Sequence, residues 1–199
     1  MRMGDLTGYG WLSHDPDLPD EIAGVHIERE ATKTRVEEYT LVDRVVCGAE
    51  CTTALDAATG YVADWHMLPY ILAARGLTVE AIDADPRTML MPAHPKVRRK
   101  IANIKNIPFP DNSFDIITCI STLEHCADHV CYKFSSEAAR TINSNGLLIV
   151  TADNYPGVSP QALAGLFKVD FDIGIDHGDE DRSFPGSKRV AYLVARRHV

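Results

Sequence analysis

Two aspartates stand where carboxylates could bind the hydroxyl groups of a ribose. The stretch TTALDA (52–57) predicts a strand that ends near Asp56, and TVEAID (78–83) predicts a strand that ends at Asp83. One turn and one helix separate them, so both carboxylates are expected at the carboxyl ends of neighbouring parallel strands, where such sheets bind ligands. Either aspartate alone is typical of a turn or a helix N-cap, but the pair favours a ligand site.

The turn after Asp56 departs from a glycine-rich loop. A loop of the form Asp-x-Gly-x-Gly-x-Gly would place glycines at positions 58, 60 and 62, where this sequence has Ala58, Gly60 and Val62. Glycines there permit a tight turn and close approach of the backbone to a ligand. Two interpretations are open, a modified cofactor loop or an ordinary strand-to-helix turn.

A third segment is more specific than the loop. Prolines, Asp111 and Asn112 predict a turn, and Phe114 and Asp115 lead from it into a buried strand. The pattern IPFPDNSFDIIT, followed by STLEH, resembles class I S-adenosylmethionine-dependent methyltransferases. AIDADPRTM and EAARTINSNGLLIVT are similar to two further stretches of that family, so the resemblance covers residues 52–152 and leaves 1–50 uncovered.

The resemblance implies S-adenosylmethionine as cofactor and gives individual residues roles. Asp56 would support the methionine amino group or its water shell, and Asp83 would hold the ribose hydroxyls. Ala84 would pack on the adenine, and Ile104 would offer its backbone N–H to the ring. Asn103 stands where the family usually has an aspartate; its amide oxygen can still accept a hydrogen bond from the adenine amino group.

The same resemblance places Ile120 and Ser121 beside the cofactor's methionine half and the acceptor. It also favours a modified first loop, because this cofactor has no phosphate to cradle. Ala58 adds one methyl group, Gly60 keeps the middle position, and Val62 is the larger departure. We therefore expect a reshaped loop, which affects cofactor affinity more than the fold.

LEHCADHVC raises a metal-site alternative. Four candidate ligands lie close together in sequence, with His125 and His129 four residues apart on an expected helix. The resemblance places residues 123–125 at the rim of the site without a metal, so no metal is expected. His125 is the candidate general base for a hydroxyl acceptor, although a packed histidine is the simpler interpretation.

The elements that must position these residues alternate along the chain. They predict an α/β fold with a doubly wound, mostly parallel sheet, and the resemblance implies seven strands with an antiparallel last strand. The expected helices are 28–46, 67–76, 86–91, 123–143 and 159–167. The expected strands are 52–57, 78–83, 100–104, 114–120 and 146–152, with a closing antiparallel pair at 169–175 and 189–196.

A single domain is expected, with residues 51–199 forming the methyltransferase-like part and residues 1–50 an arm that serves as a lid. Residues 1–24 have no clear period and predict an irregular segment. Arg35 in the arm could pair with the cofactor carboxylate, although a surface pair with Glu38 is the plainer interpretation. KVRRK (96–100) is interpreted as a solvated loop or helix end.

The composition narrows the partners. A net charge of −8 and a pI near 5.4 argue against a chain that binds nucleic acid through its overall field. No apolar stretch is long enough to span a membrane, and the first residues lack the apolar core of a signal peptide. Five cysteines without regular spacing suit the reducing cytoplasm. The oligomeric state is left open.

The sequence thus predicts methyl transfer from S-adenosylmethionine to an O, N or C atom of a small-molecule acceptor. The altered first loop motivates an alternative, a non-catalytic module of the same fold that acts as partner subunit or scaffold. An oxidoreductase with a nucleotide cofactor is the other alternative, and the IPFPDNSFD pattern argues against it.

Overall fold

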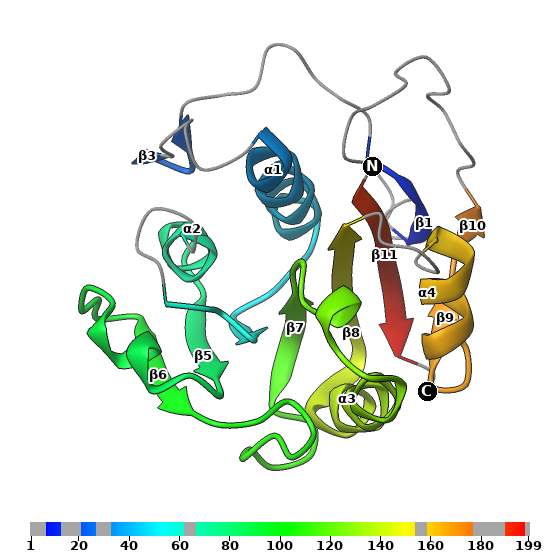
Figure 1. Ribbon diagram of the computed structural model, residues 1–199. Coiled ribbons are helices and arrows are strands. Elements are labelled where there is room, and N and C mark those ends of the chain that lie inside the picture. The colour runs from blue at the N-terminus through cyan, green and yellow to red at the C-terminus, as the bar shows by residue number, and fades with distance from the viewer. Residues whose placement is uncertain are drawn as a thin grey trace.

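A mixed sheet with helices on both faces forms the molecule (Figure 1). The computed structural model describes residues 7–12, 21–26, 33–61, 67–153, 159–176 and 190–197. Within these residues the predicted α/β fold, mostly parallel with an antiparallel last strand, is confirmed. The sheet has nine strands instead of the expected seven, because two short segments join one edge.

The strand order brings the carboxyl ends of five parallel strands to one edge. The order is β10 (Ile175–Asp176), β1 (Gly8–Trp11), β11 (Val190–Arg197), β8 (Ile142–Asp153), β7 (Phe114–Cys119), β4 (Thr53–Ala57), β5 (Thr78–Asp83) and β6 (Val97–Ile101). β9 (Phe171–Ile173) also pairs with β11. β11 runs antiparallel to β8, whereas β4, β5, β6, β7 and β8 are mutually parallel. Ligands of such sheets bind at this carboxyl edge.

Two apolar cores flank the sheet, because successive strand residues point to opposite faces. On one face Ala54 and Ile116 pack under α1 (Lys33–Cys47) and α2 (Leu68–Ala74). On the other face Leu55 and Ile117 pack under α3 (Asp128–Thr141) and α4 (Pro160–Phe167). A two-stranded ribbon, β2 (Glu21–Ile22) and β3 (Val25–His26), lies beside α1 and α2.

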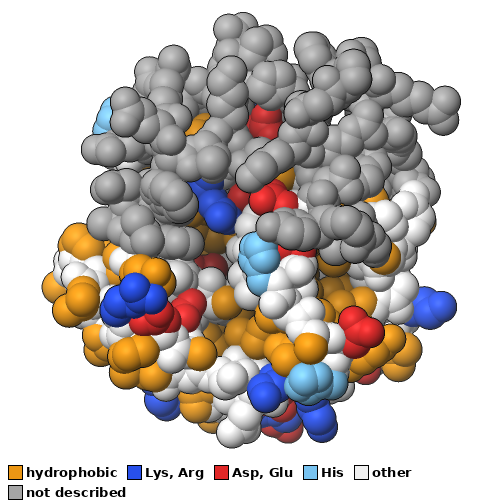
Figure 2. Space-filling model, in the orientation of Figure 1, with side chains coloured by type: hydrophobic (Ala, Val, Ile, Leu, Met, Phe, Trp, Pro, Cys, Tyr) orange, Lys and Arg blue, Asp and Glu red, His pale blue; other side chains and the backbone are white. Residues whose placement is uncertain are grey.

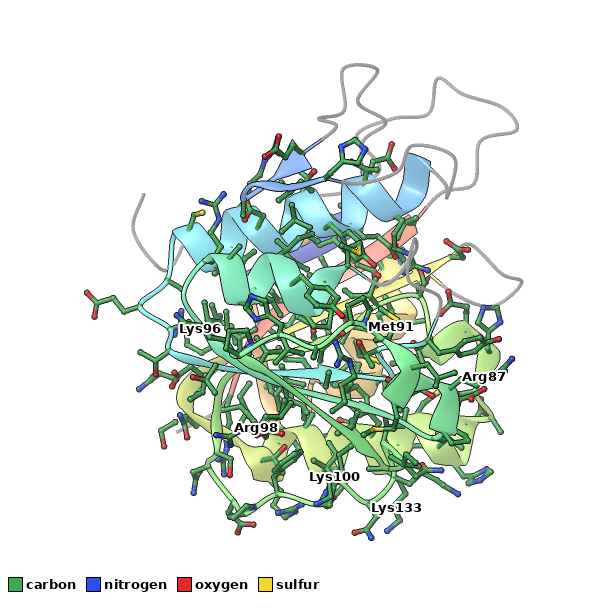
Figure 3. The ribbon with its side chains drawn as sticks, turned by 90° about the vertical axis from the view of Figure 1, so that its left-hand side faces the viewer. Arg87, Met91, Lys96, Arg98, Lys100 and Lys133 are labelled. Carbon is green, nitrogen blue, oxygen red and sulfur yellow. The ribbon has the colours of Figure 1, made fainter. Side chains whose placement is uncertain are left out.

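The third parallel strand was predicted three residues too late. It occupies Val97–Ile101 instead of 100–104, so KVRRK is an edge strand and not a solvated loop. Of its residues only Val97 is buried, while Arg98 and Lys100 are exposed. Figure 3 shows these two side chains and Lys96 along this side of the molecule. Charged side chains are common on edge strands because they oppose edge-to-edge pairing, and they hide the apolar pattern.

The N-terminal segment was also predicted wrongly in part. Residues 8–11 form β1, which pairs antiparallel with β11, so not every strand of the sheet lies beyond residue 50. β1 also pairs with β10, and Gly174 directly before β10 permits this approach, because a Cβ atom built there would lie 2.2 Å from the carbonyl oxygen of Thr7. Residues 1–6 and 13–20 lie outside the described part of the chain.

The expected helix 123–143 is interrupted. Residues 123–125 form a 3-10 turn, η4 (Leu123–His125), and Cys126 and Ala127 are extended before α3 begins at Asp128. His125 and His129 therefore do not share a helix. The expectation of two histidines one turn apart on one helix face is wrong.

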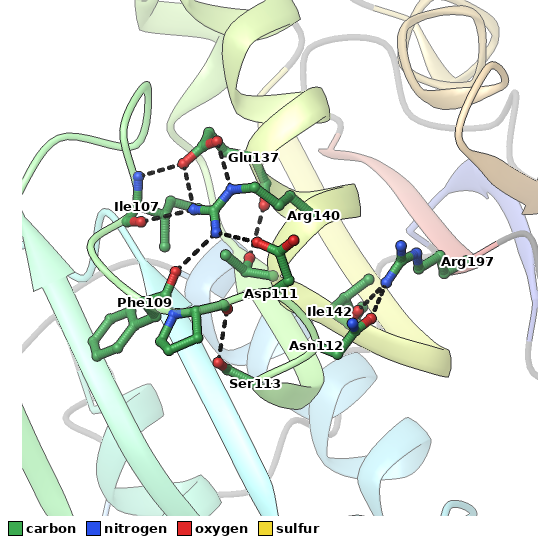
Figure 4. A network of polar contacts seen from close by, with 11 residues as sticks. Ile107, Phe109, Asp111, Asn112, Ser113, Glu137, Arg140, Ile142 and Arg197 are labelled. Atoms are coloured by element: carbon green, nitrogen blue, oxygen red, sulfur yellow. Dashed lines mark hydrogen bonds and ion pairs between the residues drawn. The ribbon is translucent and has the colours of Figure 1, made fainter.

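The IPFPDNSFD turn lies at the amino end of β7, away from the carboxyl edge, and one arginine holds it (Figure 4). The Arg140 guanidinium donates to the carbonyl oxygens of Ile107 and Phe109, both at 2.9 Å, and to Asp111 Oδ1 at 2.8 Å. Two further bonds of 2.8 and 2.9 Å join it to the Glu137 carboxylate. The turn is therefore a structural clamp between α3 and β7.

A second carboxylate of the pattern joins three strands at the same amino edge. Asp115 Oδ2 accepts the backbone N–H groups of Thr52 and Thr53 at 2.8 and 3.0 Å, and Asp115 Oδ1 accepts the Asn143 amide at 2.7 Å. These donors outweigh desolvation and lower the pKa of Asp115 to about 2. The most diagnostic part of the sequence thus serves the fold.

On the face seen in Figure 2, hydrophobic, acidic and basic side chains are mixed among the described residues. No continuous basic surface is visible on the described part of this face. Within the described chain no helix is both long and apolar enough to cross a membrane.

We predict that Arg140→Lys lowers the free energy of unfolding by about 2–3 kcal/mol, because lysine cannot reproduce a planar fork of five hydrogen bonds. Denaturant unfolding measures the change. Arg98→Lys is the matched control, since Arg98 is exposed and makes one 3.3 Å pair with Glu80. It should change the free energy by less than about 0.5 kcal/mol. Equal effects of the two substitutions would contradict the clamp.

Candidate functional site

The carboxyl ends of β4 and β5 bring Asp56 and Asp83 together as predicted. Asp83 Oδ2 accepts the backbone N–H of Gly60 at 2.8 Å, and its Oδ1 accepts the backbone N–H of Asp85 at 2.8 Å. Each carboxylate oxygen keeps a further acceptor position, so hydroxyl groups can still bind there. Asp83 therefore has two tasks, to hold the first loop and to offer acceptors to a ligand.

At its two described positions, 58 and 60, the first loop has the backbone conformation of a glycine loop, although position 58 is an alanine. Ala58 has a φ of 62° and Gly60 a φ of 76°, both in the left-handed region that favours glycine. The backbone N–H of Thr59 donates to the carbonyl oxygen of Ile82 at 3.0 Å and fixes the turn against β5. Val62 lies outside the described residues.

Asp56 is enclosed. Its side chain is 3% exposed, and the Thr118 hydroxyl donates to its Oδ1 at 2.7 Å. Burial raises the pKa of Asp56 to about 6, although the hydroxyls of Thr59 and Thr118 favour the ionised form. The nearby Asp83 carboxylate acts in the same direction as burial. Asp56 is thus a buried residue of the site, and it stabilises the first loop through the Thr59 hydroxyl.

The residues predicted beside an adenine follow β5 and β6. The backbone N–H of Ala102 donates to the carbonyl oxygen of Asp83 at 2.8 Å, which aligns the segment after β6 with the one after β5. Ala84 and Asn103 are exposed, and Ile104 is buried. Asn103 Oδ1 accepts the backbone N–H of Lys105 at 3.0 Å, so an adenine amino group would share this oxygen.

Glu38 on α1 was missed as a site residue. Its side chain is 1% exposed, and its Oε1 accepts the Ser121 and Thr151 hydroxyls, both at 2.5 Å. Ser121 follows β7 and Thr151 lies in β8, so this carboxylate ties α1 to two strand ends. Burial raises the pKa of Glu38 to about 6, against the opposing effects of Arg35 and the two hydroxyls.

Arg35 does pair with Glu38, but the expected surface location is wrong. Arg35 Nη1 lies 3.0 Å from Glu38 Oε2, and its side chain is only 17% exposed. A crevice that Arg35 and Tyr39 form with Asp56, Ala58 and other residues has a volume of about 10 Å³. That is room for roughly one water molecule. The sequence contained a signal that Arg35 and Glu38 share one face of a helix, because positions 35, 38, 42 and 45 fall on the same side of a helix.

Ile120 and Ser121 lie where they were predicted, at the end of β7. Ile120 lines the crevice, and Ser121 has a φ of 44°, which is rare for a residue with a side chain. The backbone N–H of Ser121 donates to the Thr151 carbonyl oxygen at 3.1 Å. Such strained residues are held only where the surrounding structure determines them strongly.

His125 is exposed in η4, next to Glu124, on which it acts electrostatically. A role as general base stays a prediction. Among the described residues, no group of three or more histidine, cysteine or acidic side chains could hold a metal.

A larger pocket of about 460 Å³ shares no lining residue with the crevice. It is lined from η4, α3, α4 and the end of β8. Glu124 borders this pocket. Its position is held by a hydrogen bond, because Glu124 Oε1 accepts the backbone N–H of Asp153 at 2.9 Å. The edge therefore has two hollows, one against α1 and the loop and one between α3 and α4.

Comparisons with known proteins agree with this architecture. Residues 55–150 match the family described as methyltransferase domain. A probable S-adenosylmethionine-dependent methyltransferase of Mycobacterium tuberculosis is 29% identical over 116 residues, which are 57% of this chain and 39% of that protein. An uncharacterised protein of Methanocaldococcus jannaschii is 37% identical over 75 residues, 37% of this chain and 32% of that protein. The chain thus spans about a third to two fifths of these curated relatives.

Solved structures share the fold. A TehB-like SAM-dependent methyltransferase from Corynebacterium glutamicum aligns with a TM-score of 0.60 and 14% identity, over 81% of this chain and 87% of that one. The N-methyltransferase NodS from Bradyrhizobium japonicum, solved with S-adenosyl-L-homocysteine, aligns with a TM-score of 0.62 and 11% identity, over 81% and 86%. At these identities the likeness concerns the fold alone.

We predict that Glu38→Gln changes how stability depends on pH. The pKa of Glu38 is raised from 4.5 to about 6, so the wild type binds an extra proton when folded and loses stability as pH rises through this window. The free energy of unfolding of the variant minus that of the wild type should therefore rise by about 2 kcal/mol between pH 4 and 7.5. Denaturant unfolding at several pH values measures it, and constant offsets from the lost ion pair cancel.

Glu137→Gln is the control for this series. The Arg140 guanidinium, which outweighs desolvation, lowers the pKa of Glu137, so its stabilising effect is present above pH 4.5 and is lost as pH falls. The corresponding difference should fall as pH rises. A flat profile for Glu38→Gln would mean that this carboxylate does not titrate between the two pH values.

Proposed function

We propose a function from the premise that residues 55–150 belong to the methyltransferase-domain family: the chain binds S-adenosylmethionine and transfers its methyl group to a small-molecule acceptor. The observation that carries this is the linked geometry of the first loop and Asp83, in which Gly60 and Asp83 join the ends of two neighbouring strands. The sulfonium of the cofactor supplies the methyl group in an activated form. The protein's part is to bind and align.

The residues at β5 and β6 fit the nucleoside half of the cofactor. Asp83 keeps acceptor positions for two ribose hydroxyls while its backbone bonds stay intact. The exposed Ala84 offers a small apolar surface to an adenine, and Asn103 and the backbone of Ile104 follow on the neighbouring strand. These assignments are proposals that rest on this placement.

Binding of the cofactor's methionine half requires a conformational change around Arg35. The crevice beside Asp56 and Ala58 is too small for an amino-acid group. Arg35 is the cation that borders it and is held by Glu38. A ligand carboxylate that pairs with Arg35 would move the guanidinium and widen the crevice. We therefore assign the ligand carboxylate to Arg35 and expect α1 to act as the cover of this half of the site.

A non-catalytic module is the second candidate, and the small crevice with Ala58 in a left-handed conformation favours it. Calorimetric titration with S-adenosylhomocysteine separates the two. Saturable binding supports the enzyme, whereas no binding at millimolar ligand with an intact fold supports the module. The acceptor, a cytoplasmic location and the oligomeric state stay predictions.

We predict that Asp83→Ala weakens S-adenosylhomocysteine binding by about 1.5–3 kcal/mol, because hydrogen bonds to a charged group are lost. Calorimetry measures the dissociation constant. Asp85→Ala is the matched control, since Asp85 accepts the backbone N–H of Arg87 at 2.9 Å and caps the next turn, η3 (Pro86–Leu90). The control should stay within about twofold of the wild type. An unchanged constant for Asp83→Ala would remove the ribose assignment.

We predict that Arg35→Ala weakens S-adenosylhomocysteine by about tenfold and leaves methylthioadenosine within about twofold, because only the former carries the carboxylate. Calorimetric titration of both ligands on the wild type and the variant gives the comparison. Equal losses for both ligands would show that Arg35 stabilises the fold of the edge and does not contact the amino-acid end.

A further inference from the structure

The pocket between α3 and α4 combines an apolar wall with one enclosed acid. Leu123, Leu163 and Leu166 contribute hydrophobic surface, and Glu124 borders the same space. At about 460 Å³ the pocket falls within the size range of small-molecule sites. Its wall includes Leu123, two residues beyond the strained Ser121, so it lies near the segment that follows β7.

Two carboxylate oxygens near this pocket have no hydrogen-bond partner, and of their two residues Glu124 lines the pocket while Asp153 does not. Glu124 Oε2 and Asp153 Oδ1 are enclosed and unpaired, while the other Glu124 oxygen holds the backbone N–H of Asp153. A buried acceptor without a donor costs roughly 1–3 kcal/mol, so its retention indicates a partner in the working state. The terminal torsion of a glutamate is soft, so Oε2 can turn toward a ligand in the pocket.

The nearby cation is already committed. Arg35 pairs with Glu38 at 3.0 Å, and Glu124 and Asp153 influence it only at longer range. The arrangement is therefore one guanidinium near several carboxylates, and Glu124, which also lies near the exposed His125, brings its carboxylate to the pocket wall. A positively charged or strongly donating group would complement it, and a second carboxylate would be repelled.

We propose that this pocket receives a methyl acceptor made of an apolar body and an amine, with the amine bound by Glu124. This rests on the proposed methyltransferase function and names the acceptor class. An ammonium group first gives up one proton to a carboxylate or to solvent. The nitrogen lone pair then forms the bond to the methyl carbon, and the carbon–sulfur bond breaks with its electron pair left on sulfur.

The two cysteines of the pocket do not offer a competing covalent chemistry. Burial raises the pKa of the Cys131 thiol to about 11 and also raises the pKa of Cys126. Both remain thiols near neutral pH, and a thiol is a poor nucleophile. Their place in the wall is that of small apolar side chains.

The first test uses three six-carbon probes that share a body and differ in the head: hexylamine, hexanol and hexanoate. Each is titrated calorimetrically into the full chain saturated with S-adenosylhomocysteine. Hexylamine should bind at least about tenfold more tightly than hexanol, and hexanoate should bind most weakly. Equal affinity for amine and alcohol would overturn the proposal.

The variants localise the binding. Glu124→Gln should weaken hexylamine by about tenfold, whereas Glu50→Gln, which changes an exposed acid outside the pocket, should stay within about twofold. Gly165→Phe should block the pocket with the fold intact, because a Cβ at Gly165 meets no heavy atom within 4 Å. Gly165→Ala, its control, should bind the amine like the wild type.

The experiments distinguish failure of the proposed cofactor-binding function from failure of the pocket assignment. If S-adenosylhomocysteine itself does not bind, the proposed function fails. If it binds and no amine does, or if Gly165→Phe still binds the amine normally, only the assignment of this pocket fails. If Glu124→Gln does not fold, two comparisons still test the pocket assignment. They are the affinities of hexylamine, hexanol and hexanoate for the wild type, and the binding of hexylamine to Gly165→Phe and Gly165→Ala.

Discussion

A buried carboxylate on the first long helix is the constraint on which the rest of the site depends. Glu38 takes two hydroxyl donors from the ends of two central strands and a guanidinium from its own helix. An enclosed charge without these partners would be costly, so α1 cannot leave the sheet without a large penalty. The position of Arg35 and the width of the crevice follow from this attachment.

The residues that stabilise the fold and the residues proposed to bind ligands lie at opposite ends of the strands. The hydrogen bonds of Arg140 and Asp115 lie at the amino ends, where they join α3, β4, β7 and β8. The carboxyl ends carry the left-handed residues Ala58 and Ser121 and the enclosed acids. Strain at one edge is tolerated because the other edge is firmly connected. The pattern that most clearly resembles the methyltransferase family is thus remote from the proposed ligands.

Ala58 shows how an alanine can occupy a position of the loop where the backbone conformation favours glycine. A left-handed conformation costs a residue with a Cβ roughly 1–2 kcal/mol. The hydrogen bonds of Thr59 to Ile82 and of Gly60 to Asp83 hold the turn in place despite this cost. The departure from the glycine pattern therefore alters the surface offered to a ligand, while the backbone path and the parallel pairing of β4 with β5 remain.

The sequence by itself determined the alternating elements, the parallel sheet and the meeting of Asp56 with Asp83, because strand period, helix caps and order along the chain are local. It could not determine the edge strand β6, whose exposed charges conceal its period, or β1, whose partner β11 is about 180 residues away. Only the tertiary structure decided that Glu38 is buried and that Glu124 borders a pocket. Burial and pairing of a charge depend on segments that are distant in sequence, and no local pattern records them.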